Sequence, residues 1–348
     1  MKLKILKSKI KVGVSILLLA VHVMLSGCMS GTEENQSSEK SAVVDYTCIA
    51  NPESEKKIYV ILKNYHGNYW QKVIEGITAA SGEMDAAVYL GGIDNETDIS
   101  GQITLMDEAL EADADGILLA PANSNSLVES CEKAREDKIP LVLVDSSVNS
   151  EAFDACYMTD NIDAGKKAAK EMIDMLYNAG NSPTESLEVG IMLSSDTSQA
   201  MVNRVSGFLD YWADYAPEQW EIAQDIAQNG GDLKKAQNDV LNLLKENENI
   251  KGIFGCNNTS TIGIANTLLE EKRTDGVMVG FDLSEEAEQI IRSSDYYGVV
   301  LMQNQDQMGY LGMLSLDSFI KGERTEQKYF DTEVVVVDSD YLTESDAS

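Results

Sequence analysis

Short, continuous apolar runs alternate with helical patterns along most of the chain, and this alternation constrains the fold more than any other feature. The runs include "KIYVIL", "DGILLA", "PLVLVD", "LEVGIML", "IKGIFG" and "VMVGF". Strands that are apolar at nearly every position are typical of parallel sheets covered on both faces. Stretches such as "YWQKVIEGITAASG" and "LKKAQNDVLNLLKENE" repeat apolar residues every three or four positions, which predicts helices. The βαβα order therefore predicts an α/β protein with two doubly wound parallel sheets.

The N-terminus has the three parts of a secretory signal. Five lysines lie within the first eleven residues, an apolar run extends from Val12 to Leu25, and "LSGC" comes next. The apolar run is too short for a comfortable membrane span, which needs ~20 residues. The "LSGC" ending resembles a bacterial lipobox, so we expect residues 1–27 to be a signal peptide that is removed, and Cys28 to carry lipid. The protein is then extracytoplasmic and lipid-anchored to the cell membrane.

The segment after the signal is polar, and the chain as a whole is acidic. Residues 28–55 are rich in Ser, Glu and Asn, which predicts a polar tether with too little apolar surface to fold. The whole chain has 58 acidic against 27 basic residues, a formal net charge of −31. Such a charge repels phosphate and excludes nucleic acid as a general partner.

The reactive residue types give no pattern of catalysis. The chain after the signal has one histidine, His66, and neither a nucleophile elbow, a phosphate loop nor a dinucleotide fingerprint. No metal-ligand spacing occurs, so we expect no metal and no cofactor. Cys131, Cys156 and Cys256 lie in apolar or periodic segments and are expected to be buried free thiols, whereas the state of Cys48 is left open. The sequence therefore predicts a protein that is not an enzyme.

Polar and aromatic side chains recur where the predicted strands end, which is where ligands bind to doubly wound sheets. "HGNYW" follows the first strand, Asp145-Ser146 follows "PLVLV", and Asp282 follows "VMVGF". Asn257 follows "GIFGC" and Gln303 follows "GVVLM". Such a set of hydrogen-bonding groups predicts one polyhydroxylated ligand at this edge. Asp145 and Asp282 could also imitate the carboxylate pair of a glycosidase, but the surrounding pattern is one of binding.

The ordered segments resemble the type I periplasmic binding proteins, in particular the sugar-binding group similar to ribose-binding protein. The resemblance covers residues 57–342 and rests on "DGILLAPANSNSLVESCEKAREDKIPLVLVDS", "YMTDNIDAGKKAAKEM", "NRVSGF", "GIFGCNNTSTIG", "VMVGFDLSEEAEQII" and "VVLMQNQDQMGYLG". It implies two Rossmann-like domains joined by a three-segment hinge, with crossings near Asp160, Gln303–Asn304 and Thr332. The implied domains are 56–159 plus 304–332 and 160–303 plus 333–342, with 343–348 as a tail.

The same resemblance implies the residues that contact the ligand. They are Tyr69, Trp70, Asp145, Ser146, Arg204, Asn257, Asp282 and Gln303. Aromatic faces cover the C–H face of a sugar ring, carboxylates accept from hydroxyls, and arginine donates. Each position also has a structural alternative: Tyr69 and Trp70 as core, Asp145 or Asp282 as a turn or helix cap, and Arg204 as a surface ion-pair residue.

Three departures from the ribose-type pattern bear on the ligand. Ser146 stands where an arginine directly follows the aspartate, Gly230 and Gly231 stand where ribose binders place an aromatic ring, and Asn258 stands where the family commonly has Asp. These changes argue against ribose itself and leave a sugar or another small polar molecule. The roles of Asn258 and His66 stay open.

The resemblance also implies the partners. A monomeric binding protein of this group closes around its ligand and delivers it to an ABC transporter permease. The alternative is a sensory protein that presents the bound sugar to a membrane histidine kinase or chemoreceptor. Closure about the hinge serves both roles, so the sequence does not separate them.

Overall fold

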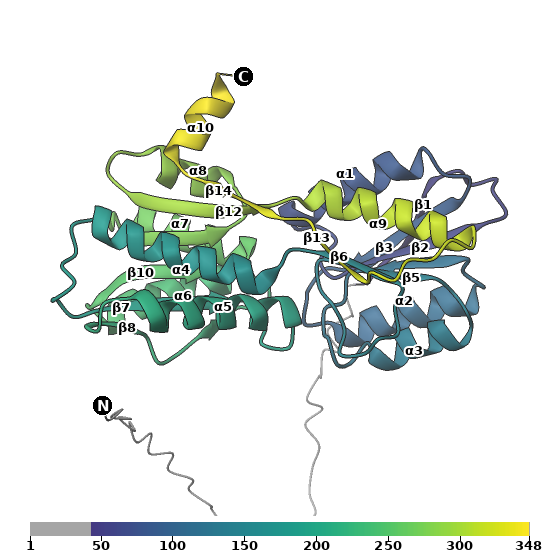
Figure 1. Ribbon diagram of the computed structural model, residues 1–348, viewed down its shortest axis with the longest axis horizontal. Coiled ribbons are helices and arrows are strands. Elements are labelled where there is room, and N and C mark those ends of the chain that lie inside the picture. The colour runs from purple at the N-terminus through teal and green to yellow at the C-terminus, as the bar shows by residue number, and fades with distance from the viewer. Residues whose placement is uncertain (1–42, 348) are drawn as a thin grey trace, which may run out of the picture. The chain divides into compact units, whose positions relative to one another are not determined.

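The computed structural model describes residues 43–347, which form two lobes, each built on a seven-stranded sheet. The signal peptide, Cys28 and the first part of the expected tether lie outside the described residues. Figure 1 shows the sheet of the first lobe on the right and that of the second lobe on the left. Both sheets are mostly parallel, as the continuous apolar strands predicted.

The first sheet has the strand order β1-β3-β2-β4-β5-β6-β13. Its strands are β1 (Val43–Ala50), β2 (Lys57–Leu62), β3 (Ala87–Ile93), β4 (Gly116–Leu119), β5 (Leu141–Val144), β6 (Ala155–Met158) and β13 (Tyr329–Asp331). Helices α1 (Asn68–Ser81) and α9 (Gln305–Ile320) share one apolar core with one face of this sheet. Helices α2 (Ile99–Glu111) and α3 (Val128–Glu136) share another with the opposite face.

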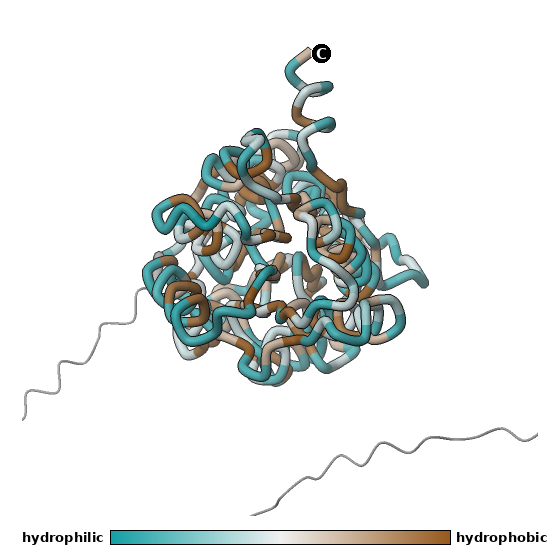
Figure 2. Tube along the Cα trace, turned by 90° about the vertical axis from the view of Figure 1, so that its left-hand side faces the viewer, coloured by the Kyte–Doolittle hydropathy of each residue, from teal (hydrophilic) through white to brown (hydrophobic). Residues whose placement is uncertain are grey.

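The second sheet has the order β14-β12-β11-β10-β7-β8, with β9 also paired to β7. Its strands are β7 (Leu187–Leu193), β8 (Trp220–Ile222), β9 (Ala227–Gln228), β10 (Ile250–Gly255), β11 (Val277–Phe281), β12 (Tyr297–Gln303) and β14 (Val334–Val337). Helices α4 (Asn161–Asn178) and α5 (Gln199–Tyr215) cover one face. Helices α6 (Leu233–Glu246), α7 (Asn258–Glu270) and α8 (Glu285–Arg292) cover the other. Viewed from the end that the second lobe forms, the outermost stretches of the chain are largely hydrophilic (Figure 2).

The chain passes between the sheets three times: after β6, after β12 and between β13 and β14. The crossing segments bond to one another. Thr159 Oγ1 donates to Gln303 Oε1 at 3.0 Å, and Asn304 Nδ2 donates to the Thr332 carbonyl at 2.6 Å. The predicted fold class, two α/β domains with a three-segment hinge, is confirmed.

The prediction of a polar tether over 28–55 is wrong for its last part. Val43–Ala50 forms β1, which pairs antiparallel with the edge strand β3. The Tyr46 hydroxyl donates to the Leu105 carbonyl at 2.8 Å, and its ring packs edge-on against Tyr59. Pairing covers the free backbone groups of β3, which an edge strand would otherwise expose. The average polarity of the segment concealed a short strand, and Cys48 lies in it as a half-buried free thiol.

The expected tail at 343–348 also needs correction, because α10 (Ser339–Asp346) runs through most of it. Asp338 caps the helix by accepting from the Tyr341 N–H at 2.8 Å. Near the other end, the Arg292 guanidinium donates to both carboxylate oxygens of Asp346 at 2.8 and 3.1 Å.

Candidate functional site

A cleft between the lobes collects polar side chains from the carboxyl ends of strands in both sheets. Its cavity volume is about 40 Å³. The residues that line it are Lys63, Asn64, Gly67, Tyr69, Trp70, Glu96, Asp145, Ser194, Met201, Arg204, Asn257, Asn258, Thr259, Asp282 and Gln303. Seven of the eight residues predicted to contact a ligand are among them, and Ser146 is not.

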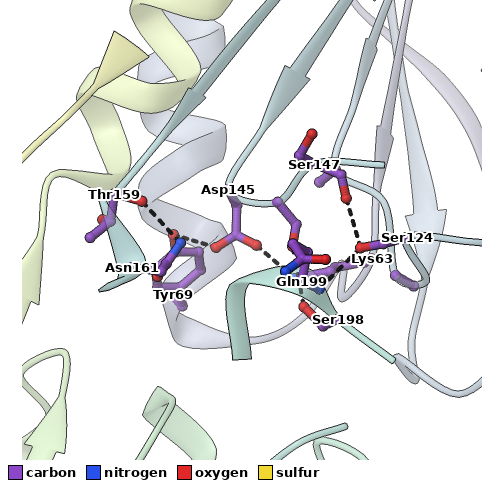
Figure 3. A network of polar contacts seen from close by, with 12 residues as sticks. Lys63, Tyr69, Ser124, Asp145, Ser147, Thr159, Asn161, Ser198 and Gln199 are labelled. Atoms are coloured by element: carbon purple, nitrogen blue, oxygen red, sulfur yellow. Dashed lines mark hydrogen bonds and ion pairs between the residues drawn. The ribbon is translucent and has the colours of Figure 1, made fainter. Parts of the chain in front are cut away.

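Asp145 lies directly after β5, with its backbone in the left-handed region at φ 65°. Its N–H donates to the Tyr157 carbonyl on β6 at 2.9 Å, which holds the turn. The carboxylate accepts from the Tyr69 hydroxyl at 2.8 Å and lies 2.6 Å from Lys63 Nζ (Figure 3). Burial alone would raise the pKa of Asp145, but the charge and hydrogen bond of Lys63 hold it below its usual value. Asp145 is therefore an ionised acceptor and not a turn cap.

Sequence reasoning missed Lys63. This lysine is only 4% exposed and directly follows Leu62, the last residue of β2. The available signal was its position: a lysine immediately after an apolar parallel strand points toward the edge where ligands bind. It supplies a positive charge beside Asp145.

Asp282 occupies the matching position after β11, with φ 64°. Its N–H donates to the Leu301 carbonyl on β12 at 2.9 Å. Amide groups, not a lysine, bond its carboxylate: Gln303 Nε2 at 3.1 Å and Gln305 Nε2 at 2.7 Å. Burial raises the pKa of Asp282 to about 7, because the Arg204 charge and the Gln303 hydrogen bonds offset it only in part. Ser284, not Asp282, caps α8, so the capping alternative fails.

Arg204 is 1% exposed, so the surface alternative is wrong. Its guanidinium lies 3.8 Å from the centre of the Phe281 ring. It donates to Asn161 Oδ1 at 2.6 Å, to the Cys256 carbonyl at 2.6 Å and to Gln303 Oε1 at 2.5 Å. All three acceptors are uncharged, and Asn161 was not foreseen. Arg204 is thus a fixed donor fork in the floor of the cleft.

Tyr69 and Trp70 serve the core and the cleft together. Both lie in the first turn of α1, are 9% and 3% exposed, and pack in the apolar cluster of the first lobe. Their rings meet edge-on with centroids 5.0 Å apart. The two interpretations of these residues are therefore compatible, since one side of each ring packs inward and another side lines the cleft.

Asn257 caps α7 and lines the cleft. Its side-chain oxygen accepts from the Ser260 hydroxyl at 2.5 Å and from the Ser260 N–H at 3.3 Å. The structural role therefore explains part of why an amide follows β10. Asn258 also lines the cleft, whereas His66 is exposed outside the lining residues, with Nε2 3.2 Å from Asp94 Oδ1.

Ser146 does not line the cleft and instead helps to join the lobes. It is fully buried, and its hydroxyl lies 3.2 Å from that of Ser198 in the second lobe. Beside it, Ser124 of the first lobe donates its N–H to the Thr197 carbonyl at 3.2 Å and accepts from the Gln199 N–H at 3.0 Å. Figure 3 shows Ser124, Ser198 and Gln199 near Asp145. The two lobes thus meet directly along one flank, and the cleft is closed there.

Three further properties of residues 43–347 bear on function: metal binding, membrane spanning and the state of the cysteines. No group of three or more His, Cys, Asp or Glu side chains in this range could hold a metal ion. No helix in the same range has the length and apolarity needed to cross a membrane. Cys131, Cys156 and Cys256 are buried free thiols, as expected, and burial raises the pKa of each.

Residues 58–324 match the family model described as "Periplasmic binding protein domain". The chain belongs to this family. It is a family of binding proteins, not of enzymes, which agrees with the absence of a catalytic pattern in the sequence.

Two curated relatives extend over most of the chain. The D-allose-binding periplasmic protein of Escherichia coli is 26% identical over 73% of this chain and 81% of its own length. The D-apiose import binding protein of Actinobacillus succinogenes is 23% identical over 81% of this chain and 88% of its own length.

Solved structures show the same fold. An ABC transporter solute-binding protein of Agrobacterium vitis with bound D-fucose is 29% identical, with a TM-score of 0.77 over 84% of this chain and 98% of its own. A carbohydrate transporter solute-binding protein of Agrobacterium radiobacter in complex with D-arabinose is 25% identical. Its TM-score is 0.78 over 84% of this chain and 97% of its own length.

Proposed function

We propose that this protein captures a monosaccharide or a close derivative in the cleft and delivers it to an ABC transporter. The observation that carries the proposal is the pair Asp145 and Asp282. They come from equivalent strand ends of the two lobes and face one enclosed space together with the Arg204 fork. The similar proteins bind or hold D-allose, D-apiose, D-fucose and D-arabinose, which supports the ligand class.

Closure is the mechanism that this arrangement supports. Tyr69, Trp70 and Asp145 lie on the first lobe, and Arg204, Asn257 and Asp282 on the second. A ligand that bonds to both lobes stabilises the closed form, because only part of its contacts are available when the lobes are apart. The closed form then presents one surface made of both lobes to the membrane partner.

The test is a screen of the full chain, purified in mild detergent, against monosaccharides, sugar alcohols and amino acids. We expect at least one sugar to raise the unfolding temperature and to bind with a measurable heat in calorimetry. If amino acids bind and no sugar does, the ligand class is wrong. Stimulation of sugar uptake by neighbouring permease components, compared with phosphorylation of a neighbouring kinase, would separate transport from sensing.

We also propose that Cys28 carries the lipid that keeps the protein at the outer face of the membrane. The support is the "LSGC" sequence after the apolar run. Labelled fatty acid should enter the wild-type protein and not Cys28→Ser, which should be released or remain unprocessed. Cys48→Ser is the matched control and should be labelled normally. Equal labelling of wild type and Cys28→Ser would contradict the anchor.

A further inference from the structure

The cleft wall contains a carboxylate that is not among the proposed ligand contacts. Glu96 comes after β3 in the first lobe and lines the cleft. Its loop is held by Asn95, whose side chain accepts from the Thr97 N–H at 2.9 Å. From this loop the side chain reaches toward the second lobe, where Ser194 lines the same cleft.

Two glycines of the second lobe lie opposite this loop, Gly230 next to Thr97 and Gly231 next to Glu96. Gly230 and Gly231 have φ values of 66° and 80°, which side chains rarely adopt. The Gly230 N–H donates to the Ser194 carbonyl at 2.8 Å, and the Gly231 N–H donates to Asn229 Oδ1 at 2.9 Å. A Cβ atom on Gly231 would lie 3.7 Å from Glu96 Cγ. Neither glycine lines the cleft, so Glu96 and not a side chain from this turn faces the ligand space here.

The charges in the cleft do not balance. Its lining residues include three carboxylates, Glu96, Asp145 and Asp282, against two cations, Lys63 and Arg204. Asp282, with a pKa of about 7, is only partly ionised near neutral pH, so the excess negative charge lies at Glu96 and Asp145 around Lys63. Lys63 lies 2.6 Å from Asp145, and Arg204 donates to uncharged acceptors near Asp282. Beside Glu96, the Ser194 hydroxyl also lowers the pKa of this carboxyl but carries no charge.

The pKa shifts of Glu96 and Lys63 agree with this excess of negative charge. Burial raises the pKa of Glu96, and the charge of Lys63 offsets this only in part. Burial would lower the pKa of Lys63, but Asp145 first and Glu96 second raise it above its usual value. One lysine therefore serves two carboxylates, and a further positive charge in the cleft would stabilise both ionised forms.

We propose that Glu96 determines the specificity of this site and selects a sugar that carries a protonated amine over its neutral parent sugar. This inference rests on the proposed function, since it names the class of sugar that the same cleft takes. An ammonium group donates charge-assisted hydrogen bonds to a carboxylate and supplies the missing positive charge. A neutral hydroxyl in the same place donates a weaker bond and leaves the charge unbalanced, a difference of about tenfold in affinity.

The experiment measures calorimetric affinities of the full chain in mild detergent. The probes are deoxyamino hexoses with the amine at carbon 2, 3, 4 or 6, each paired with its parent hexose and its N-acetyl form. The variants are Glu96→Gln, which removes the charge and keeps the shape, and Asp94→Asn, a rim carboxylate two residues away, as the matched control. Thermal unfolding of each variant checks that it folds.

In the wild type we expect at least one amino sugar to bind about tenfold or more tightly than its parent and its N-acetyl form. Glu96→Gln should weaken the amino sugar about tenfold and leave the parent within about twofold. Asp94→Asn should leave the affinities for the amino sugar and for the parent sugar unchanged. Ser194→Ala, which removes only the hydroxyl, should keep the preference for the amine.

Three results would overturn the inference. A parent sugar that binds as tightly as every amino form would leave the proposed function standing and remove the amine preference. Equal weakening of both sugars by Glu96→Gln and Ser194→Ala would make Glu96 a bond between lobes and not a selector. An amine preference that survives Glu96→Gln would assign the amine to another carboxylate. If no sugar of any kind binds, the proposed function fails as well.

Discussion

The two lobes end their central strands in the same way and then diverge. Asp145 follows β5 at φ 65° and Asp282 follows β11 at φ 64°, and each N–H bonds to a carbonyl on the next strand. Asp145 pairs with a buried lysine, whereas Asp282 accepts from two glutamine amides. The pKa of Asp145 is lowered and that of Asp282 is raised to about 7.

Comparing Asp145 with Asp282 separates the effect of backbone geometry from the effect of the neighbouring side chains. The same strand–turn geometry aims a carboxylate into the cleft in both lobes, but the neighbouring side chains decide whether it is ionised. A full positive charge at 2.6 Å from Asp145 offsets the loss of hydration that burial imposes. At Asp282, the Arg204 charge and the Gln303 hydrogen bonds offset this loss only in part. The first lobe therefore offers a permanent acceptor, and the second offers an acceptor that titrates near neutral pH.

The largest expected effect comes from removing the lysine. Lys63→Met leaves Asp145 buried without its counter-charge, which should lower the free energy of unfolding by about 3–5 kcal/mol. Gln305→Met is the matched change beside Asp282 and should cost about 1–2 kcal/mol, since a neutral donor is lost. Urea unfolding of the full chain followed by circular dichroism measures both. Equal losses in the two lobes would show that the lysine and the amide play equivalent parts.

Ligand affinity gives the next largest effect. Asp145→Ala and Asp282→Ala should each weaken binding of the screened sugar by at least about tenfold, because each removes a charged hydrogen bond worth ~1.5–3 kcal/mol. Trp70→Ala should also weaken it, together with a loss of stability from the core. Calorimetry measures the affinities. If both aspartate variants bind like the wild type, the cleft is not the site.

The pH dependence should distinguish the lobes. As the pH falls from about 8 to about 6, Asp282 takes up a proton and accepts hydroxyl bonds less well, so affinity should fall by about tenfold. Asp282→Asn should abolish this dependence, whereas Asp145, with its lowered pKa, should remain ionised throughout.

Stability should move in the opposite direction. The folded protein holds the Asp282 proton up to about pH 7, whereas the unfolded chain releases it near its ordinary pKa of 3.8. The contribution of Asp282 to the free energy of unfolding therefore decreases as the pH rises through this window. Urea titrations of wild type and Asp282→Asn across the window measure the difference, and parallel curves for the two proteins would contradict the raised pKa.

The smallest effect is expected at Ser146. Its hydroxyl lies 3.2 Å from that of Ser198 and outside the cleft. Ser146→Ala should change sugar affinity by less than about threefold, through a slightly weaker contact between the lobes. A loss as large as that of Asp145→Ala would place Ser146 among the ligand contacts, as the sequence resemblance had implied.

The sequence alone determined the architecture and most of the cleft. Strands that are apolar at every position must be covered on both faces, and the side chains directly after them must gather at one edge. This logic is local, so it found Asp145, Asp282 and Gln303 without knowledge of any contact, whereas Arg204, which lies within α5, came from the family resemblance. It failed for β1, because the short strand Val43–Ala50 is followed by another strand and not by a helix, and its polar neighbours hide it.

Only the tertiary structure decided which charges meet. Lys63 and Asp145 are far apart in the sequence and end strands β2 and β5, which are neighbours of β4 and not of each other. Glu96 reaches the glycine turn of the other lobe only because the two lobes close on each other. A side chain's type fixes which bonds it can make, but its ionisation and its partner depend on burial and on charges brought near by the fold. For that reason the sequence located the cleft, and the folded chain determined its charge balance.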